Sequence, residues 1–117
     1  MNRKLRLSNS SDFQRVRRSG KAYTHPLVVL IADHTGQPTS RFAVAAGKAF
    51  GLATRRNRAK RLLREAIRRS LPNVEPGWDV VLIARQPILD AQTTSVLEAV
   101  QSLLKRAGMI GEYDDIR

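Results

Sequence analysis

The segment Trp78-Asp79-Val80-Val81-Leu82-Ile83-Ala84 follows a glycine, Gly77, and is apolar at every position from Val80 onward. Its length and its β-branched residues are typical of a β-strand. A strand without polar alternation is typical of the centre of a sheet that is covered on both faces. The sequence therefore predicts an α/β domain organised around this strand.

Two amphipathic helices flank this strand along the chain. The first is predicted from about Arg55 to Ser70 and ends before Pro72, and the second from Asp90 to Ala107, with Gly108 as the residue that ends it. Apolar residues recur in both at intervals of three and four, which gives each helix one face for a core. These residues are Ala59, Leu62, Leu63, Ala66 and Ile67 in the first helix, and Val96, Leu97, Val100, Leu103 and Leu104 in the second.

The N-terminal half predicts a short helix followed by strands. Ser11 and Gln14 have the spacing of a capping box at the start of the helix, and Gly20 can end it in a left-handed conformation. Residues 27–32 and 41–46 read as two strands of a hairpin joined by the loop 33–40, with a possible extra short strand near Ala22. The predicted order is α-β-β-α-β-α, in one domain spanning residues 1–117 whose ends, 1–7 and 110–117, are expected to be flexible.

Composition excludes several classes of protein. The chain has no cysteine and only two histidines, which argues against a disulfide framework, a thiol nucleophile and a cysteine zinc site. It has no Ser/His/acid set and no carboxylate cluster, so no catalytic residue and no metal ligand is predicted. No apolar run is long enough to span a membrane, and no secretory signal is evident, so a cytoplasmic protein without a membrane partner is expected.

The net charge of +11 indicates a polyanionic partner. Residues 1–21 carry seven Lys and Arg against one acid, and residues 41–69 carry ten against one, whereas residues 70–117 carry four against seven acids. Arg outnumbers Lys by 16 to 5, and a guanidinium group can bind phosphate oxygens in pairs. Charge concentrated in two segments of a folded domain favours a defined nucleic-acid surface.

The densest cluster of cations lies where the first long helix begins, from Arg55 to Arg64. Cations there oppose the helix dipole, whereas free N–H groups at the same end favour phosphate. The placement therefore suggests that an anion is bound, although an ordinary solvated basic face remains the alternative.

The triplet Arg56-Asn57-Arg58, followed by Lys60-Arg61 and Arg64, resembles the RNR motif of the protein subunit of bacterial ribonuclease P. The resemblance extends from about Arg6 to Leu104. It includes Asp12-Phe13 and Gly20 near the start, Lys48 and Gly51 before the helix, and Ala84-Arg85-Gln86-Pro87 after the last strand.

This resemblance implies an α+β two-layer sandwich with a four-stranded mixed sheet and a left-handed βαβ crossover, similar to domain 2 of ribosomal protein S5. It implies that an RNA subunit, with Mg²⁺ held mainly by RNA and substrate, removes the 5′ leader of precursor tRNA. The protein would bind as a monomer, one per RNA subunit, hold the leader, and strengthen the binding of substrate and Mg²⁺.

Carried over position by position, the resemblance implies two groups of site residues. Those expected to bind the RNA subunit are Lys48, Arg55, Arg56, Asn57, Arg58, Lys60, Arg61, Arg64 and Arg68. Those expected to face the leader of precursor tRNA are Phe13, Arg17, Ile31, Lys48 and Arg85. Arg17 and Ile31 stand where the family often has aromatic residues, so base stacking is expected to be weaker here.

Two other functions fit the charge alone. A ribosomal or other structural RNA-binding protein of similar fold is the first alternative. A DNA-binding regulator is the second, although the chain has no helix-turn-helix pattern.

Overall fold

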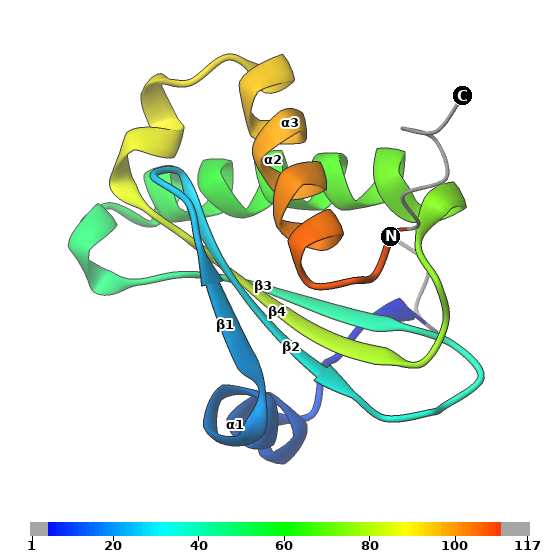
Figure 1. Ribbon diagram of the computed structural model, residues 1–117. Helices are drawn as coiled ribbons and strands as arrows, with labels where there is room; N and C mark the ends of the chain where they lie inside the picture. Colours follow the sequence, from blue (N-terminus) through cyan, green and yellow to red (C-terminus); the bar gives the residue numbers. More distant parts are fainter. Residues whose placement is uncertain (1–4, 111–117) are drawn as a thin grey trace, which may run out of the picture.

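The computed structural model describes residues 5–110, which form a four-stranded sheet with helices on both faces (Figure 1). The strands are β1 (Lys21–Thr24), β2 (Val28–His34), β3 (Arg41–Ala46) and β4 (Trp78–Ala84), and their spatial order is β1-β2-β4-β3. β4 pairs antiparallel with β2 and parallel with β3. The expected α+β class with a mixed four-stranded sheet is confirmed, and the short strand near Ala22 is present as β1.

The predicted hairpin between residues 27–32 and 41–46 is wrong, because β4 lies between the two strands. β4 is apolar on both faces, so it takes a central position and separates β2 from β3. The connection after β2 then passes the beginning of β4. There the N–H groups of Thr35 and Gly36 donate to the carbonyl of Gly77 at 2.7 and 3.2 Å.

The connection from β3 to β4 contains the helix α2 (Ala53–Ser70), after the short 3-10 helix η2 (Lys48–Phe50). In Figure 1 the chain passes from β3 up to α2 and back down to β4, which is the next strand toward the viewer. This crossover is left-handed, as the family resemblance implies.

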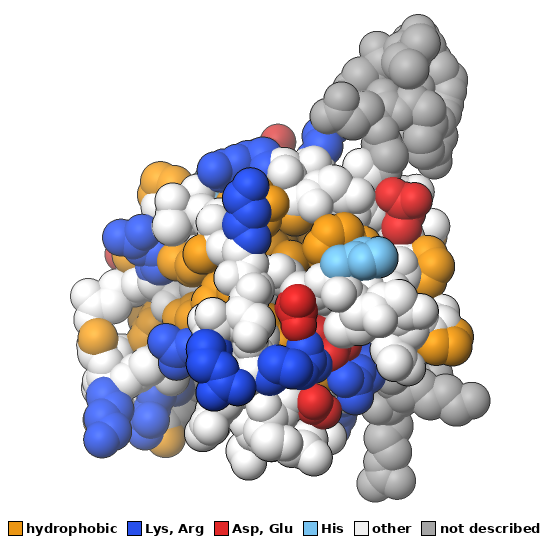
Figure 2. All heavy atoms as spheres, turned by 60° about the horizontal axis from the view of Figure 1, so that its bottom comes forward, with side chains coloured by type: hydrophobic (Ala, Val, Ile, Leu, Met, Phe, Trp, Pro, Cys, Tyr) orange, Lys and Arg blue, Asp and Glu red, His pale blue; other side chains and the backbone are white. Residues whose placement is uncertain are grey.

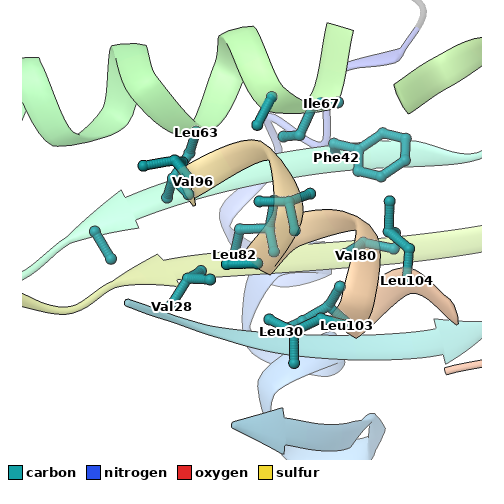
Figure 3. Packing of buried hydrophobic residues seen from close by; sticks show 14 of the residues in the cluster. Val28, Leu30, Phe42, Leu63, Ile67, Val80, Leu82, Val96, Leu103 and Leu104 are labelled. Atoms are coloured by element: carbon teal, nitrogen blue, oxygen red, sulfur yellow. The ribbon is translucent and has the colours of Figure 1, made fainter. Parts of the chain in front are cut away.

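The main core lies between the sheet and the pair α2 and α3 (Thr93–Arg106) (Figure 3). α3 begins later than predicted, because Gln86–Asp90 form a separate 3-10 helix, η4. Its end is as predicted: Gly108 has φ +81°, and the N–H groups of Gly108 and Met109 donate to the carbonyls of Lys105 and Leu104.

Helix α1 (Ser10–Ser19) packs on the opposite face of the sheet, where Leu7, Val16, Ile31 and Val81 form a second, smaller core. The predicted capping box is wrong, because the N-cap is Asn9, whose side chain accepts from the N–H of Ser11 at 2.8 Å.

Gly20 is not left-handed either, since its φ of −77° and ψ of 163° are extended. Its role is close packing: a Cβ built at this position would lie 2.6–2.9 Å from Val16 O, Ile31 Cγ2 and Ala32 O. The absence of a side chain therefore lets the end of α1 approach β2.

The chain ends are partly tied to the domain. Within the segment 1–7, which was expected to be flexible, Leu7 is buried and its N–H donates to the carbonyl of Phe42 at 2.8 Å. Ile110 likewise forms a bridge with Val74. Residues 1–4 and 111–117, where flexibility was also expected, lie outside the described residues. Within residues 5–110, no helix is both long and apolar enough to cross a membrane.

Candidate nucleic-acid interface

Helix α2 carries eight Lys and Arg residues but only one carboxylate, Glu65. Its buried stripe consists of Ala59, Leu63, Ala66, Ile67 and Ser70, so the cations occupy the remaining surface of the helix. Only Arg68 pairs with Glu65, at 2.5 Å, and this hydrogen bond lowers the pKa of the exposed carboxylate. Within the described part of the chain, the other cations of α2 have no ion pair, so their charge is available to an anion.

The beginning of α2 has no internal group that balances this charge. The N-cap is Leu52, which provides no side-chain hydrogen bond, and the first turn contains no acid. The free N–H groups and the cations of the first turns therefore face solvent together, an arrangement that favours phosphate over a cation.

A second surface lies on the other side of the sheet, beside α1. Val29, Ala43, Ala45 and Ile83 point to the α1 face by strand alternation and are half-buried, because α1 covers only part of that face. We call these four residues the open sheet face. Figure 2 looks onto this side and shows exposed hydrophobic side chains lying among Lys and Arg side chains.

Both borders of the open sheet face carry cations. On α1, the half-buried Phe13 and the exposed Arg17 lie one turn apart. At the far end of the strands, a groove of about 420 Å³ runs from Ile83 to Arg85 and is also lined by Gly47 and Ala49, the neighbours of Lys48. An apolar surface between cationic borders suits single-stranded nucleic acid, because the bases can pack on the apolar residues while the phosphates bind the cations.

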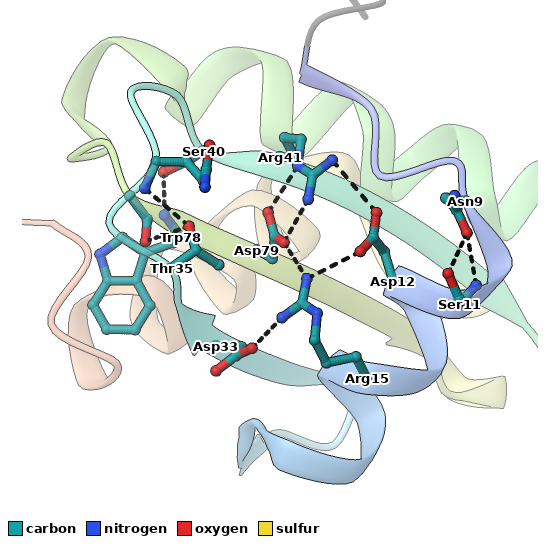
Figure 4. A network of polar contacts seen from close by, with 12 residues as sticks. Asn9, Ser11, Asp12, Arg15, Asp33, Thr35, Ser40, Arg41, Trp78 and Asp79 are labelled. Carbon is teal, nitrogen blue, oxygen red and sulfur yellow. Dashed lines mark hydrogen bonds and ion pairs between the residues drawn. The ribbon is translucent and has the colours of Figure 1, made fainter.

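An ion cluster fixes α1 to the sheet at the end opposite this groove (Figure 4). Asp79 of β4 is fully buried, and Arg41 of β3 donates to both of its carboxylate oxygens, at 3.0 and 2.8 Å. Arg15 of α1 donates to Asp79 at 2.5 Å and also pairs with Asp33 of β2. Asp12 completes the cluster, 3.4 Å from Arg15 and 3.5 Å from Arg41.

The cluster keeps Asp79 ionised. Burial disfavours its charged form, but the hydrogen bonds and charges of Arg41 and Arg15 outweigh burial and hold the pKa of Asp79 below its ordinary value. The hydrogen bonds to Asp79 in turn raise the pKa of both guanidinium groups. These two arginines are thus neutralised internally, unlike the cations of α2.

Comparison with known proteins decides the family. The ribonuclease P family model matches residues 1–108. The ribonuclease P protein component of Roseiflexus castenholzii is 40% identical over 111 residues, which cover 94% of this chain and 91% of the relative. The ribonuclease P protein component of Herpetosiphon aurantiacus is 38% identical over 107 residues, which cover 92% of this chain and 87% of the relative. The chain belongs to the ribonuclease P protein family.

Solved structures agree with this assignment. The RNase P protein of Thermotoga maritima matches with a TM-score of 0.78 and 32% identity, covering 86% of this chain and 96% of that one. The RNase P protein of Staphylococcus aureus matches with a TM-score of 0.80 and 26% identity, covering 92% and 98%. Membership of this family gives the chain a role in ribonuclease P.

The fold brings most of the expected site residues together. Eight of the residues assigned to the RNA subunit lie on α2, where Arg56 and Lys60 are half-buried and Arg55, Asn57, Arg58, Arg61, Arg64 and Arg68 are exposed. Lys48 lies apart from them in η2 and is exposed. Phe13, Arg17 and Arg85 border the open sheet face.

Ile31 does not fit the expected role in this family member. It is packed against α1 with only 7% of its surface exposed, so it has little surface for a leader. Its neighbours on the same face, Val29 and Ile83, are the accessible residues. Strand alternation places Val29, two residues before Ile31, on the same face of the sheet.

The ion cluster was also missed. Its only signal in the sequence is Asp79, a single acid at the start of an otherwise apolar strand. Among residues 5–110, no three His, Cys, Asp or Glu side chains are grouped as metal ligands would be.

Proposed function

We propose that this chain is the protein subunit of a ribonuclease P ribonucleoprotein that removes the 5′ leader of precursor tRNA. In this proposal Lys48 and the eight residues of α2 named above, which do not include Arg69, bind the catalytic RNA. The open sheet face holds the leader between α1 and Arg85. The reaction centre belongs to the RNA subunit, one protein binds one RNA subunit, and the complex acts in the cytoplasm.

The observation that carries the proposal is the contrast between two sets of arginines. Arg15 and Arg41 are neutralised by buried or half-buried carboxylates, whereas Arg55, Arg56, Arg58, Arg61 and Arg64 have no ion pair among the described residues. A surface of unpaired arginines at a helix N-terminus is suited to a phosphate backbone.

The proposed effect on Mg²⁺ follows from the same charge. A precursor tRNA and an RNA subunit repel each other, and Mg²⁺ must screen this repulsion in the absence of protein. A cationic protein that contacts both RNAs lowers the Mg²⁺ concentration needed for their association, without a metal ligand of its own.

Reconstitution tests the proposal. The protein is combined with ribonuclease P RNA from the same organism, and removal of the leader is measured over a series of Mg²⁺ concentrations. We expect cleavage at Mg²⁺ concentrations where the RNA alone is inactive. Failure of the protein to lower the Mg²⁺ requirement would contradict the proposal, and co-purification with ribosomal RNA instead would favour a structural RNA-binding role.

A further inference from the structure

One flank of α2 points toward the free edge of the sheet. Arg56, Lys60 and Arg64 recur every four residues and so form a row along the helix. Arg64, at the end of the row, lines a groove of about 320 Å³ together with Arg6, Leu7, Phe42, Ala43 and Val44. We call this the β3-edge groove.

The β3-edge groove exposes backbone as well as cations. β3 is the edge strand, and among the described residues the N-terminal segment pairs with it only through the bridge between Arg6 and Phe42, where the N–H of Leu7 donates to the carbonyl of Phe42. Since alternate residues of a strand direct their N–H and C=O to the same side, Val44, two residues after Phe42, directs its N–H and C=O away from β4. An uncovered edge of this kind can bind an anion through its N–H groups, and here two arginines flank it.

The charges of the groove remain unbalanced. Within residues 5–110, neither Arg6 nor Arg64 has an ion pair or a hydrogen bond through its side chain, and both are exposed. The groove shares only Ala43 with the open sheet face, and its other lining residues belong to the N-terminal segment, the outer edge of β3 and α2.

We infer that the β3-edge groove binds a phosphodiester segment of the ribonuclease P RNA, which continues from the Arg56-Lys60-Arg64 row onto the sheet edge. The guanidinium groups of Arg6 and Arg64 bind phosphate oxygens, the Val44 N–H donates to the same backbone, and its carbonyl can accept from a ribose 2′-hydroxyl. This inference rests on the proposed function and adds Arg6 and the β3 edge to the RNA-binding surface.

Binding of the ribonuclease P RNA by the full-length protein, measured over a range of salt concentrations, tests the groove. Arg6→Ala and Arg64→Ala should each reduce the slope of log affinity against log salt by about 0.7–0.9. If the variants and the wild type bind equally at 1 M salt, this change in slope corresponds to roughly a fivefold loss of affinity at 0.15 M salt. Arg69→Ala is the matched control, because Arg69 is an exposed cation on the other flank of α2. It should retain the wild-type slope.

The outcomes separate the groove from the proposed function. If the wild-type protein binds this RNA no better than an unrelated RNA of equal length, the proposed function itself fails. If Arg58→Ala weakens RNA binding while Arg6→Ala and Arg64→Ala do not, only the groove is overturned. The same conclusion holds if Arg69→Ala reduces the affinity for the RNA as much as Arg6→Ala and Arg64→Ala do. If Arg6→Ala reduces affinity for precursor tRNA alone, the groove holds the leader and our assignment is wrong.

A mapping experiment gives a second, independent result. Since the chain has no cysteine, Ser8→Cys can carry a single tethered iron chelate beside Arg6, and Ser102→Cys on α3 provides an exposed control. Hydroxyl radicals from position 8 should cut the ribonuclease P RNA at one discrete region. Cleavage no stronger than from position 102 would overturn the inference.

Discussion

Arg15 of α1 and Asp79 of β4 are 64 residues apart in the sequence, yet Arg15 Nη2 donates to Asp79 Oδ2 at 2.5 Å. Asp79 is fully buried and also accepts two hydrogen bonds from Arg41 of β3. Through Asp79, α1 is therefore joined to β4 and, by way of Arg41, to β3. This contact sets where α1 lies on the sheet and how much of the α1 face stays open.

Asp79→Asn should destabilise the protein. The substitution removes the buried negative charge and leaves Arg15 and Arg41 without their main partner. Because both arginine side chains are 32% exposed, they keep contact with water, and we expect a loss of about 1–3 kcal/mol rather than the larger cost of a buried unpaired charge. Urea denaturation measures it.

Glu65→Gln is the matched control for Asp79→Asn, since it breaks the exposed ion pair with Arg68. An exposed pair contributes little to the free energy of unfolding. Equal losses in the two variants would show that the burial of Asp79 has no consequence.

The same carboxylate predicts a pH dependence. The pKa of Asp79 is lower in the folded protein than the value of about 3.9 in an unfolded chain. Its ion pairs therefore contribute fully above the unfolded pKa and are lost as the pH falls through the folded pKa. We expect the difference in free energy of unfolding between wild type and Asp79→Asn to be constant at neutral pH and to shrink under acid conditions. A difference that grows toward low pH would contradict the assignment.

Gly20→Ala should displace the C-terminal end of α1. A Cβ at Gly20 would meet two backbone carbonyls and Ile31 within 3.0 Å, and backbone cannot move aside as a side chain can. We expect a loss of about 1–3 kcal/mol in the free energy of unfolding. Gly47→Ala is the control, because a Cβ there has no neighbour within 4 Å and the backbone φ of −77° suits any residue. Equal stability of the two variants would refute close packing at Gly20.

Leu52→Asn should stabilise the protein. Leu52 is 65% exposed and occupies the N-cap of α2 with extended φ and ψ, the conformation in which an Asn side chain accepts from the N–H groups of the first turn. We expect a gain of about 0.5–2 kcal/mol over Leu52→Ala, measured by thermal unfolding. Equal melting temperatures would mean that the first turn of α2 does not need a cap.

Local patterns predicted the elements and the cationic helix, because periodicity and charge are properties of neighbouring residues. The order of the strands was not predictable in the same way. Residues 33–40 have the length and composition of a hairpin loop, and only the two-sided burial of β4 places that strand between β2 and β3.

The site was predictable to a similar extent. The cations of α2 come from one continuous segment, so the sequence showed them together. The ion cluster joins Asp12, Arg15, Asp33, Arg41 and Asp79 from four elements, and the burial of Ile31 depends on where α1 docks. Both follow from tertiary packing, which the local sequence does not specify.

Phe13 distinguishes leader binding from simple packing. It is half-buried beside the open sheet face, whereas Val16, three residues later in α1, is fully buried. If Phe13 contacts the leader, Phe13→Ala should weaken precursor tRNA binding to the reconstituted complex more than mature tRNA binding, by about 1–3 kcal/mol if a base stacks on the ring. Val16→Ala, which only creates a cavity in the core, should reduce stability and affect both tRNAs equally. If Phe13→Ala reduces the affinities for precursor and mature tRNA equally, Phe13 is a core residue. The leader would then have to contact residues of the open sheet face instead.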